Sequence, residues 1–169
     1  TDELQANAPA LTPDGTWVYY LVDRSVPGGG AVDLKRVRLD GAGRETLMVI
    51  DHPLPGTHFR PSRIYPLSTI SSDGTRYAAA AYLGDGQTPN APWGLMLFDL
   101  LKNTVELIVQ GSSWCNIHPQ FCRSADPEAK HWIMIQENHG NTCDTAGNIV
   151  SYVSGAGADI HLIRDDGTP

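Results

Sequence analysis

Two copies of one pattern decide the fold of this chain: Asn7-Ala-Pro-Ala-Leu-Thr-Pro-Asp-Gly-Thr-Trp-Val-Tyr-Tyr-Leu21 and Tyr65-Pro-Leu-Ser-Thr-Ile-Ser-Ser-Asp-Gly-Thr-Arg-Tyr-Ala-Ala79. Each copy places Asp-Gly-Thr, a sequence typical of tight turns, directly before a run rich in apolar and aromatic residues. The aspartates of the two turns, Asp14 and Asp73, are 59 residues apart. A repeat of this length indicates that the chain is built from successive copies of one structural unit.

A second landmark repeats at the same interval, because Val37-Arg-Leu-Asp40 recurs as Met96-Leu-Phe-Asp99. A third copy starts at His118-Pro-Gln-Phe and closes with Ile160-His-Leu-Ile-Arg-Asp-Asp-Gly167. The closing aspartate of this copy, Asp166, follows the closing aspartate of the second copy, Asp99, by 67 residues rather than 59. We therefore expect an insertion in the third copy, within residues 139–158.

Each copy predicts the order strand, turn, strand, longer loop, strand, turn, strand. Asp-Gly corners favour turns, whereas the Val, Ile, Tyr and Leu runs between them fit a pleated sheet. We predict an all-β protein with about three four-stranded antiparallel sheets, stacked as β-propeller blades. The repeats cover approximately residues 5–55, 62–112 and 114–169 of a single partial domain, 1–169. A β-sandwich is the alternative, although it does not require a long repeat of whole units.

The length of the chain conflicts with a closed ring. Propellers typically have four to eight blades, whereas 169 residues at a period near 59 supply about three. An open end would expose a sheet face and a strand edge that proteins normally cover. We therefore expect an incomplete propeller that is completed by further C-terminal blades or by self-assembly.

Charge and hydropathy exclude two classes of partner. Nineteen acidic residues against twelve basic ones give a net charge of −7, and the densest basic run is Lys35-Arg36-Val37-Arg38. Such a chain lacks the cationic surface that tracks nucleic-acid phosphates. No apolar stretch approaches the roughly 20 residues that a membrane-spanning helix needs. We predict no nucleic-acid partner and no membrane association.

The cysteines and the N-terminus bear on the compartment. The three cysteines, Cys115, Cys122 and Cys143, are odd in number and confined to the last third of the chain, which is a poor disulfide framework. We expect reduced thiols, with a Cys115–Cys122 bridge as the alternative. The N-terminus shows no signal-peptide pattern. The reduced thiols favour a cytoplasmic location, with the periplasm as the alternative, and the N-terminus leaves export open.

Candidate functional residues gather in two places. His52 and His58 precede Arg60 and Arg63 in the loop between the first two copies. Guanidinium groups in such an interblade loop suit a carboxylate ligand, and a proline-stiffened surface linker is the plainer interpretation.

In the third copy, His118 and Gln120 share one strand face, and His139 follows the next strand. The two histidines would converge across a hairpin as an acid–base pair, or as two of several metal ligands. The chain lacks the CxxC and HExxH spacings that identify metal sites.

The third copy also resembles a known family. His118-Pro-Gln-Phe, Asp126-Pro, Ile133-Met-Ile-Gln136 before His139-Gly, and Asp159-Ile-His-Leu-Ile with a closing Asp-Gly-Thr168 are similar to oligogalacturonate lyases, and the whole repeat is similar to Tol-type propellers. The lyase resemblance is specific over about residues 114–168. It implies a seven-bladed propeller that cleaves pectin-derived uronate oligosaccharides by β-elimination, with a histidine base and a divalent metal, usually Mn²⁺.

The resemblance implies roles for individual residues. His139 would be the base, and His118 a supporting or substrate-contacting residue. The expected substrate-binding residues are Arg60, Arg63, Gln120, Arg123 and Gln136. The metal ligands of the family lie in later blades, so we expect no metal ligands and little lyase activity in this chain alone.

A non-catalytic propeller that serves as a binding scaffold is the alternative function. The net charge of −7 favours this alternative over a polyanionic substrate, although a local basic pocket outweighs net charge within about 8 Å. No Gly-x-Ser-x-Gly motif supports a serine hydrolase.

Overall fold

The computed structural model of the chain describes residues 5–152 and 155–169. Residues 1–4, on which the signal-peptide analysis rests, lie outside the described residues. Sheet 1 and sheet 2 are four-stranded, antiparallel and ordered as in the sequence. Their strands are β1 (Ala6–Leu11), β2 (Trp17–Val26), β3 (Gly29–Arg38) and β4 (Glu45–Ile50), then β5 (Arg63–Ile70), β6 (Arg76–Tyr82), β7 (Trp93–Asp99) and β8 (Thr104–Gly111).

Sheet 3 differs from the expected four strands in having three, in the order β13-β10-β9. They are β9 (Gln120–Phe121), β10 (Trp132–Asn138) and β13 (Ala158–Arg164). After β13 the chain enters a turn, in which the backbone N–H of Arg164 donates to the carbonyl of Thr168 at 2.7 Å. The predicted insertion is present as a separate two-stranded hairpin of β11 (Thr142–Cys143) and β12 (Ile149–Ser151).

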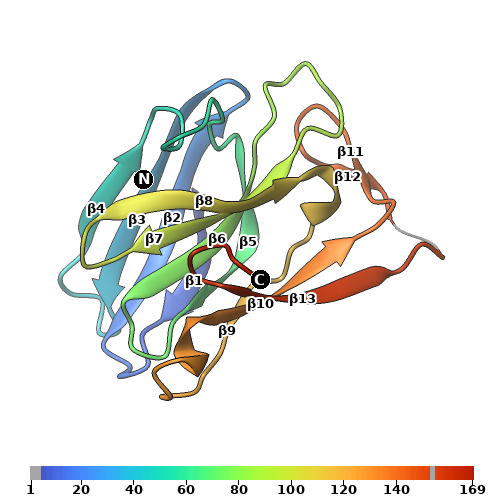
Figure 1. Cartoon of the computed structure of the whole chain (residues 1–169). Coiled ribbons are helices and arrows are strands. Elements are labelled where there is room, and N and C mark those ends of the chain that lie inside the picture. Colours follow the sequence, from blue (N-terminus) through green and yellow to red (C-terminus); the bar gives the residue numbers. More distant parts are fainter. Residues whose placement is uncertain (1–4, 153–154) are drawn as a thin grey trace.

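The described residues contain no α-helix, only the short 3-10 segments η2 (Ser112–Trp114) and η3 (Ala129–His131). Figure 1 shows the three sheets following one another, sheet 1 in blue and cyan, sheet 2 in green and yellow, and sheet 3 in orange and red. The first strands of successive sheets are neighbours, since β1 lies beside β5 and β5 beside β9. Within residues 5–152 and 155–169, no helix has the length and apolar character that a bilayer crossing requires.

The Asp-Gly-Thr turns repeat because each forms the same hydrogen bonds. The Asp14 carboxylate accepts from the Thr12 hydroxyl at 2.6 Å and from the Thr16 N–H at 3.0 Å. Asp73 accepts from the hydroxyl of Ser71 and from both groups of Thr75 in the same way. The glycine that follows each aspartate has a positive φ, 71° and 72°, which a glycine adopts without strain. The turn chemistry read from the sequence is therefore confirmed.

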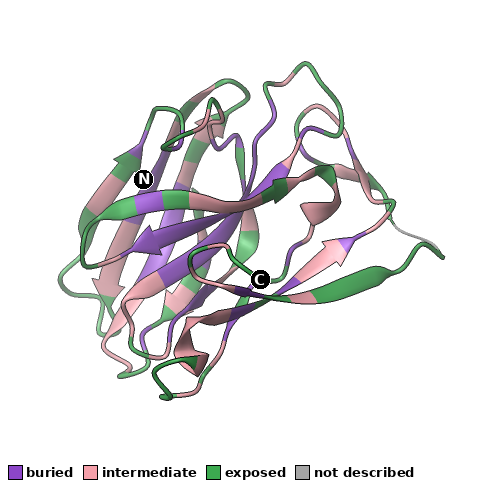
Figure 2. Ribbon diagram, viewed as in Figure 1, coloured by how far each residue is buried: buried purple, intermediate pink, exposed green. Residues whose placement is uncertain are grey.

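Sheet 2 forms the centre of the core because both of its faces are covered. Along β6 the side chains alternate: Tyr77, Ala79 and Ala81 pack with sheet 1 residues, whereas Ala78 and Ala80 pack with sheet 3 residues. The run of small alanine side chains lets the neighbouring sheets approach closely. Figure 2 shows the buried residues concentrated in sheet 2, while much of β13 is exposed. This packing of sheet on sheet is the arrangement of successive propeller blades.

The turn aspartates predict a loss of stability in acid. Hydrogen bonds from the Thr12 hydroxyl and from Thr16 lower the pKa of Asp14. At Asp73, partial burial acts to raise the pKa of the carboxyl group. Hydrogen bonds from Lys130, Ser71 and Thr75 outweigh it and hold this pKa far below the usual range. A group with a lowered folded-state pKa contributes stability that is complete above its unfolded pKa and is lost as the pH falls through the folded pKa.

We therefore expect the contribution of the turn aspartates to the free energy of unfolding, measured with urea, to be constant from about pH 7 to pH 5 and to fall steeply below about pH 4. In the Asp73→Asn variant the stability at neutral pH should be lower and the fall in acid shallower. Equal stabilities of the wild-type chain at pH 5 and pH 3 would contradict this account.

Candidate functional site

One end of sheets 2 and 3 gathers most of the candidate residues, and we call it the upper end. β5 begins there at Arg63, and β10 ends there at Asn138. The N–H of Gln136 donates to the carbonyl of Ile117 at 2.7 Å, so the last part of β10 lies beside the segment that leads into β9. His118 and His139 therefore lie at the same end of sheet 3.

A cleft of about 570 Å³ opens at the upper end, and we call it the inner cleft. It lies beside the starts of the first two sheets' inner strands and the β11–β12 hairpin. Its lining combines aromatic rings, a cation, a carboxylate and amide groups, chiefly Arg63, Tyr65, Trp93, Asn148 and Tyr152, together with Asp23. The Arg63 guanidinium donates to Oδ1 of Asn148. Aromatic side chains beside a guanidinium suit a ligand that carries both a ring and a carboxylate.

His118 adjoins the inner cleft through Tyr65. Its Nε2 lies 3.2 Å from the Tyr65 hydroxyl and 3.0 Å from Oδ1 of Asn116. Because the Asn116 oxygen can only accept, the neutral imidazole donates through Nε2 and keeps its Nδ1 lone pair. Burial raises the pKa of Tyr65, so its hydroxyl stays protonated at neutral pH. The arrangement leaves an exposed imidazole with a proton-accepting nitrogen beside the cleft.

The segment that carries His118 has a backbone that few residues adopt. Asn116 has a φ of 65° and His118 a φ of 47°, both in the left-handed region. A buried side chain holds this path in place, because the Asn138 amide donates to the carbonyls of Cys115 at 2.7 Å and Asn116 at 3.1 Å. Gln136 completes the brace by donating to Oδ1 of Asn138 at 2.6 Å.

His139 forms a separate pair with a carboxylate. Its Nε2 lies 2.9 Å from Oδ2 of Asp159, a residue near the start of β13. The hydrogen bond to Asp159 raises the pKa of His139, and the charge of Glu137 adds to the effect. A carboxylate that orients an imidazole in this way fixes the ring and stabilises its protonated form. Within residues 5–152 and 155–169, no hydrogen bond joins His139 to His118.

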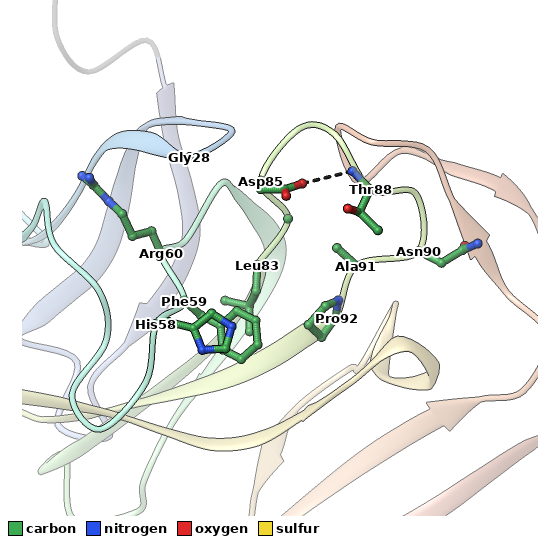
Figure 3. Close-up of a pocket in the computed structure, with 11 residues that line it drawn as sticks. Gly28, His58, Phe59, Arg60, Leu83, Asp85, Thr88, Asn90, Ala91 and Pro92 are labelled. Atoms are coloured by element: carbon green, nitrogen blue, oxygen red, sulfur yellow. Dashed lines mark hydrogen bonds between the residues drawn. The ribbon is translucent and has the colours of Figure 1, made fainter.

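Arg60 lies in a second cavity, of about 450 Å³, between the 58–60 loop and the 83–92 loop. Its guanidinium donates to the carbonyl of Gly30 at 2.8 Å and to that of Asp51. Figure 3 shows this guanidinium directed away from Leu83 and Pro92, which lie on the other side of the cavity. Arg60 therefore joins two loops and does not reach the inner cleft.

The other predicted substrate-binding residues are dispersed. Gln120 is exposed on β9, and Gln136 is occupied with Asn138. Arg123 lies at the opposite end of sheet 3, because the adjacent Ser124 carbonyl accepts from Ser72, in the turn between β5 and β6. Of the predicted set, Arg63 lines the inner cleft, His118 contacts the cleft residue Tyr65, and His139 pairs with Asp159 at the same end of sheet 3.

Sequence reasoning missed several residues of the upper end. Tyr65 appeared only as the start of the second repeat, although an aromatic residue at the start of an inner strand was an available signal. Asn148 and Tyr152 lie in the insertion, whose path no repeat pattern predicts. Asp159 was noted in the family resemblance, but its pairing with His139 depends on the register of β10 and β13, in which Glu137 and Asp159 are opposite each other.

The described residues do not fit a manganese site. Among them, no group of three or more His, Cys, Asp and Glu side chains is arranged to hold a metal ion. We therefore derive no step through a metal from this chain.

Comparison with solved structures shows which known folds the chain resembles. Over 98% of its length the chain superimposes on an oligogalacturonate lyase in complex with manganese, with a TM-score of 0.60 and 19% identity. The oligogalacturonate lyase of Vibrio parahaemolyticus gives a TM-score of 0.58 and 14% identity over 94% of this chain. TolB from Acinetobacter baumannii gives 0.51 and 12% over 97%. No protein-family model matches the chain, and no curated protein is similar to it in sequence.

These likenesses define the class: the chain is a set of consecutive β-propeller blades. The fold resemblance to oligogalacturonate lyase and to TolB, expected from the repeats, is confirmed. At these identities the comparison establishes the fold alone. The chain spans 39% and 37% of the two lyases and 42% of TolB, which is well under half of each propeller protein.

Proposed function

We propose that this chain is the substrate-binding part of a propeller lyase that cleaves uronate oligosaccharides by β-elimination. The observation that carries the proposal is the inner cleft, which Arg63 and Tyr65 line and where the Tyr65 hydroxyl contacts the imidazole of His118. The His139–Asp159 pair at the same end of sheet 3 adds a second imidazole, held by a carboxylate. The likeness of the fold to oligogalacturonate lyases supports the choice of substrate class.

The residues suit the reaction in a simple way. Arg63 would bind the uronate carboxylate, and its positive charge would stabilise the negative charge that develops when the proton next to that carboxylate is removed. His139, oriented by Asp159, would take this proton. The electron pair then forms the carbon–carbon double bond while the bond to the 4-linked oxygen breaks. The leaving oxygen takes a proton from water, and the proton that His139 holds neutralises the hydroxide left behind. His118 and Tyr65 would contact the sugar ring.

Calorimetric titration of the full chain with trigalacturonate tests the binding step. We expect binding that Arg63→Ala weakens about tenfold to a hundredfold, because a charged hydrogen bond to the carboxylate is lost. Arg24→Ala is the matched control, since Arg24 is a surface arginine of sheet 1 paired with Asp33. A methyl-esterified oligosaccharide should bind like the variant. Equal affinity for the charged and esterified ligands would contradict the proposal.

Ultraviolet absorbance of the released conjugated alkene tests the chemical step, with Mn²⁺ added and then chelated. Where turnover is measured, His139→Ala should lower the rate about 10²–10⁴-fold. Asp159→Asn should move the acidic limb of the pH profile to lower pH, because Asp159 raises the pKa of His139 and the base must be unprotonated. Carboxylate-specific binding without turnover is expected both of a lyase part that lacks the later blades and of a non-catalytic binding module, whereas a limb that stays in place would remove His139 as the base.

A further inference from the structure

Two of the three cysteines meet in the core. The Sγ atoms of Cys115 and Cys143 are 3.5 Å apart, and the two residues are 0% and 4% exposed. They share a buried cluster with Tyr82, Ala91 and Trp93. Cys122 is partly exposed and follows β9, whereas Cys115 precedes it. In the described part of the chain, no contact joins Cys122 to either of the other thiols, so the Cys115–Cys122 alternative has no support in the geometry.

The surroundings hold both cysteines in place. The Cys143 backbone is pinned to the 83–92 loop, because its N–H donates to Oδ1 of Asn90 at 2.7 Å and its carbonyl accepts from the Asn90 N–H at 3.1 Å. On the other side, the Cys115 carbonyl accepts from Asn138 at 2.7 Å. A disulfide requires the sulfurs to approach to about 2.05 Å. The two sulfurs, 3.5 Å apart, therefore have about 1.5 Å left to close.

We propose that Cys115 and Cys143 form a disulfide when the chain folds in the presence of a small disulfide oxidant such as oxidised glutathione. The thiolate of one cysteine attacks the oxidant and forms a mixed disulfide, releasing one glutathione thiol. The second cysteine then loses its proton and attacks the protein sulfur, which expels the other glutathione. The two protein thiols are oxidised by two electrons, and one oxidised glutathione becomes two reduced molecules.

The cross-link would join the connection between sheets 2 and 3 to the β11–β12 hairpin. That hairpin carries Asn148 and Tyr152, so the disulfide would fix one wall of the inner cleft. Burial and the neighbouring Cys143 thiol raise the pKa of Cys115 to about 12. Because the thiolate is the reacting form, oxidation should be fast during folding and slow in the folded chain. The cross-link does not depend on the proposed lyase activity.

Peptide mapping after refolding in a glutathione redox buffer tests the pairing. Free thiols are alkylated and the chain is digested without reduction. Trypsin leaves Cys115 and Cys122 together in residues 103–123 and puts Cys143 in residues 131–164. We expect these two peptides to be linked in the wild-type chain and in Cys122→Ser, and unlinked in Cys143→Ser. A second cleavage after Phe121 separates Cys115 from Cys122 in the wild-type chain, so the assignment does not depend on a variant that folds.

Oxidation should also raise the melting temperature by about 5–10 °C, because the cross-link restricts the unfolded chain. Dithiothreitol should reverse the rise in the wild-type chain and in Cys122→Ser. A Cys115–Cys122 link, a link between two chains, or three alkylated thiols after refolding with excess oxidised glutathione would each overturn the proposal.

Discussion

Replacement of Phe98 by Ala is expected to lower the free energy of unfolding by about 3–5 kcal/mol. The Phe98 side chain is 0% exposed and lies on the face of β7 that packs against sheet 1. Its ring centroid is 5.6 Å from that of Tyr77, whose hydroxyl donates to the carbonyl of Ala8 in β1. Removing the ring leaves a cavity between two sheets that small alanine side chains already bring close together.

Urea unfolding followed by tryptophan fluorescence and by circular dichroism gives the measurement. Leu101→Ala is the control, because Leu101 is 76% exposed in the turn after β7 and its loss should cost less than about 0.5 kcal/mol. Phe98→Leu should lie between the two. A loss below about 1 kcal/mol in Phe98→Ala would mean that sheets 1 and 2 do not form one core.

Replacement of Asn138 by Leu, a side chain of similar size, should lower the free energy of unfolding by about 2–4 kcal/mol. Asn138 is 3% exposed, and its amide donates to the carbonyls of Cys115 and Asn116. Leucine would leave both carbonyls without these donors, the Cys115 carbonyl in a buried position. The same amide holds the left-handed backbone of the segment that carries His118, so the loss should disturb the inner cleft as well as the overall stability.

Two readouts separate these effects. Urea unfolding measures the global loss, with Gln110→Ala as the control, because Gln110 is exposed on β8. Nuclear magnetic resonance of the histidine rings should show His118 shifted in Asn138→Leu, while His52, which is exposed in the loop between sheets 1 and 2, stays unchanged. A stable variant with an undisturbed His118 signal would show that the brace is not needed.

The regular part of the fold was predictable because its causes are local. An Asp-Gly-Thr turn forms its hydrogen bonds within five residues, as Asp14 and Asp73 do with neighbours two positions away. Such turns set where each hairpin begins, and the spacing of 59 residues shows that whole sheets repeat. The third copy does not follow this spacing. Its extra residues form the β11–β12 hairpin, and its sheet has three strands rather than four.

The candidate site was predictable only in part. Arg63 and His118 were identifiable because loops between blades and the starts of inner strands lie at one end of a propeller. Arg60 belongs to the same interblade loop as Arg63, and Arg123 follows β9, yet neither lines the inner cleft. Arg60 turns toward the carbonyls of sheet 1 and its loop, and Arg123 leaves β9 at the far end of the sheet. The residue type suggested that all three arginines bind a carboxylate. Only the structure shows that Arg63 alone among them lines the inner cleft.

By itself, the sequence determined the class of fold and the repeated unit, because turn chemistry and strand patterning act over a few residues. Only the tertiary structure decided which distant groups meet. The Tyr65–His118 contact spans 53 residues, and Cys115 lies against Cys143 rather than near Cys122. Such pairs depend on how one sheet packs on the next, and that packing is set by the summed shape of many buried side chains rather than by any local pattern.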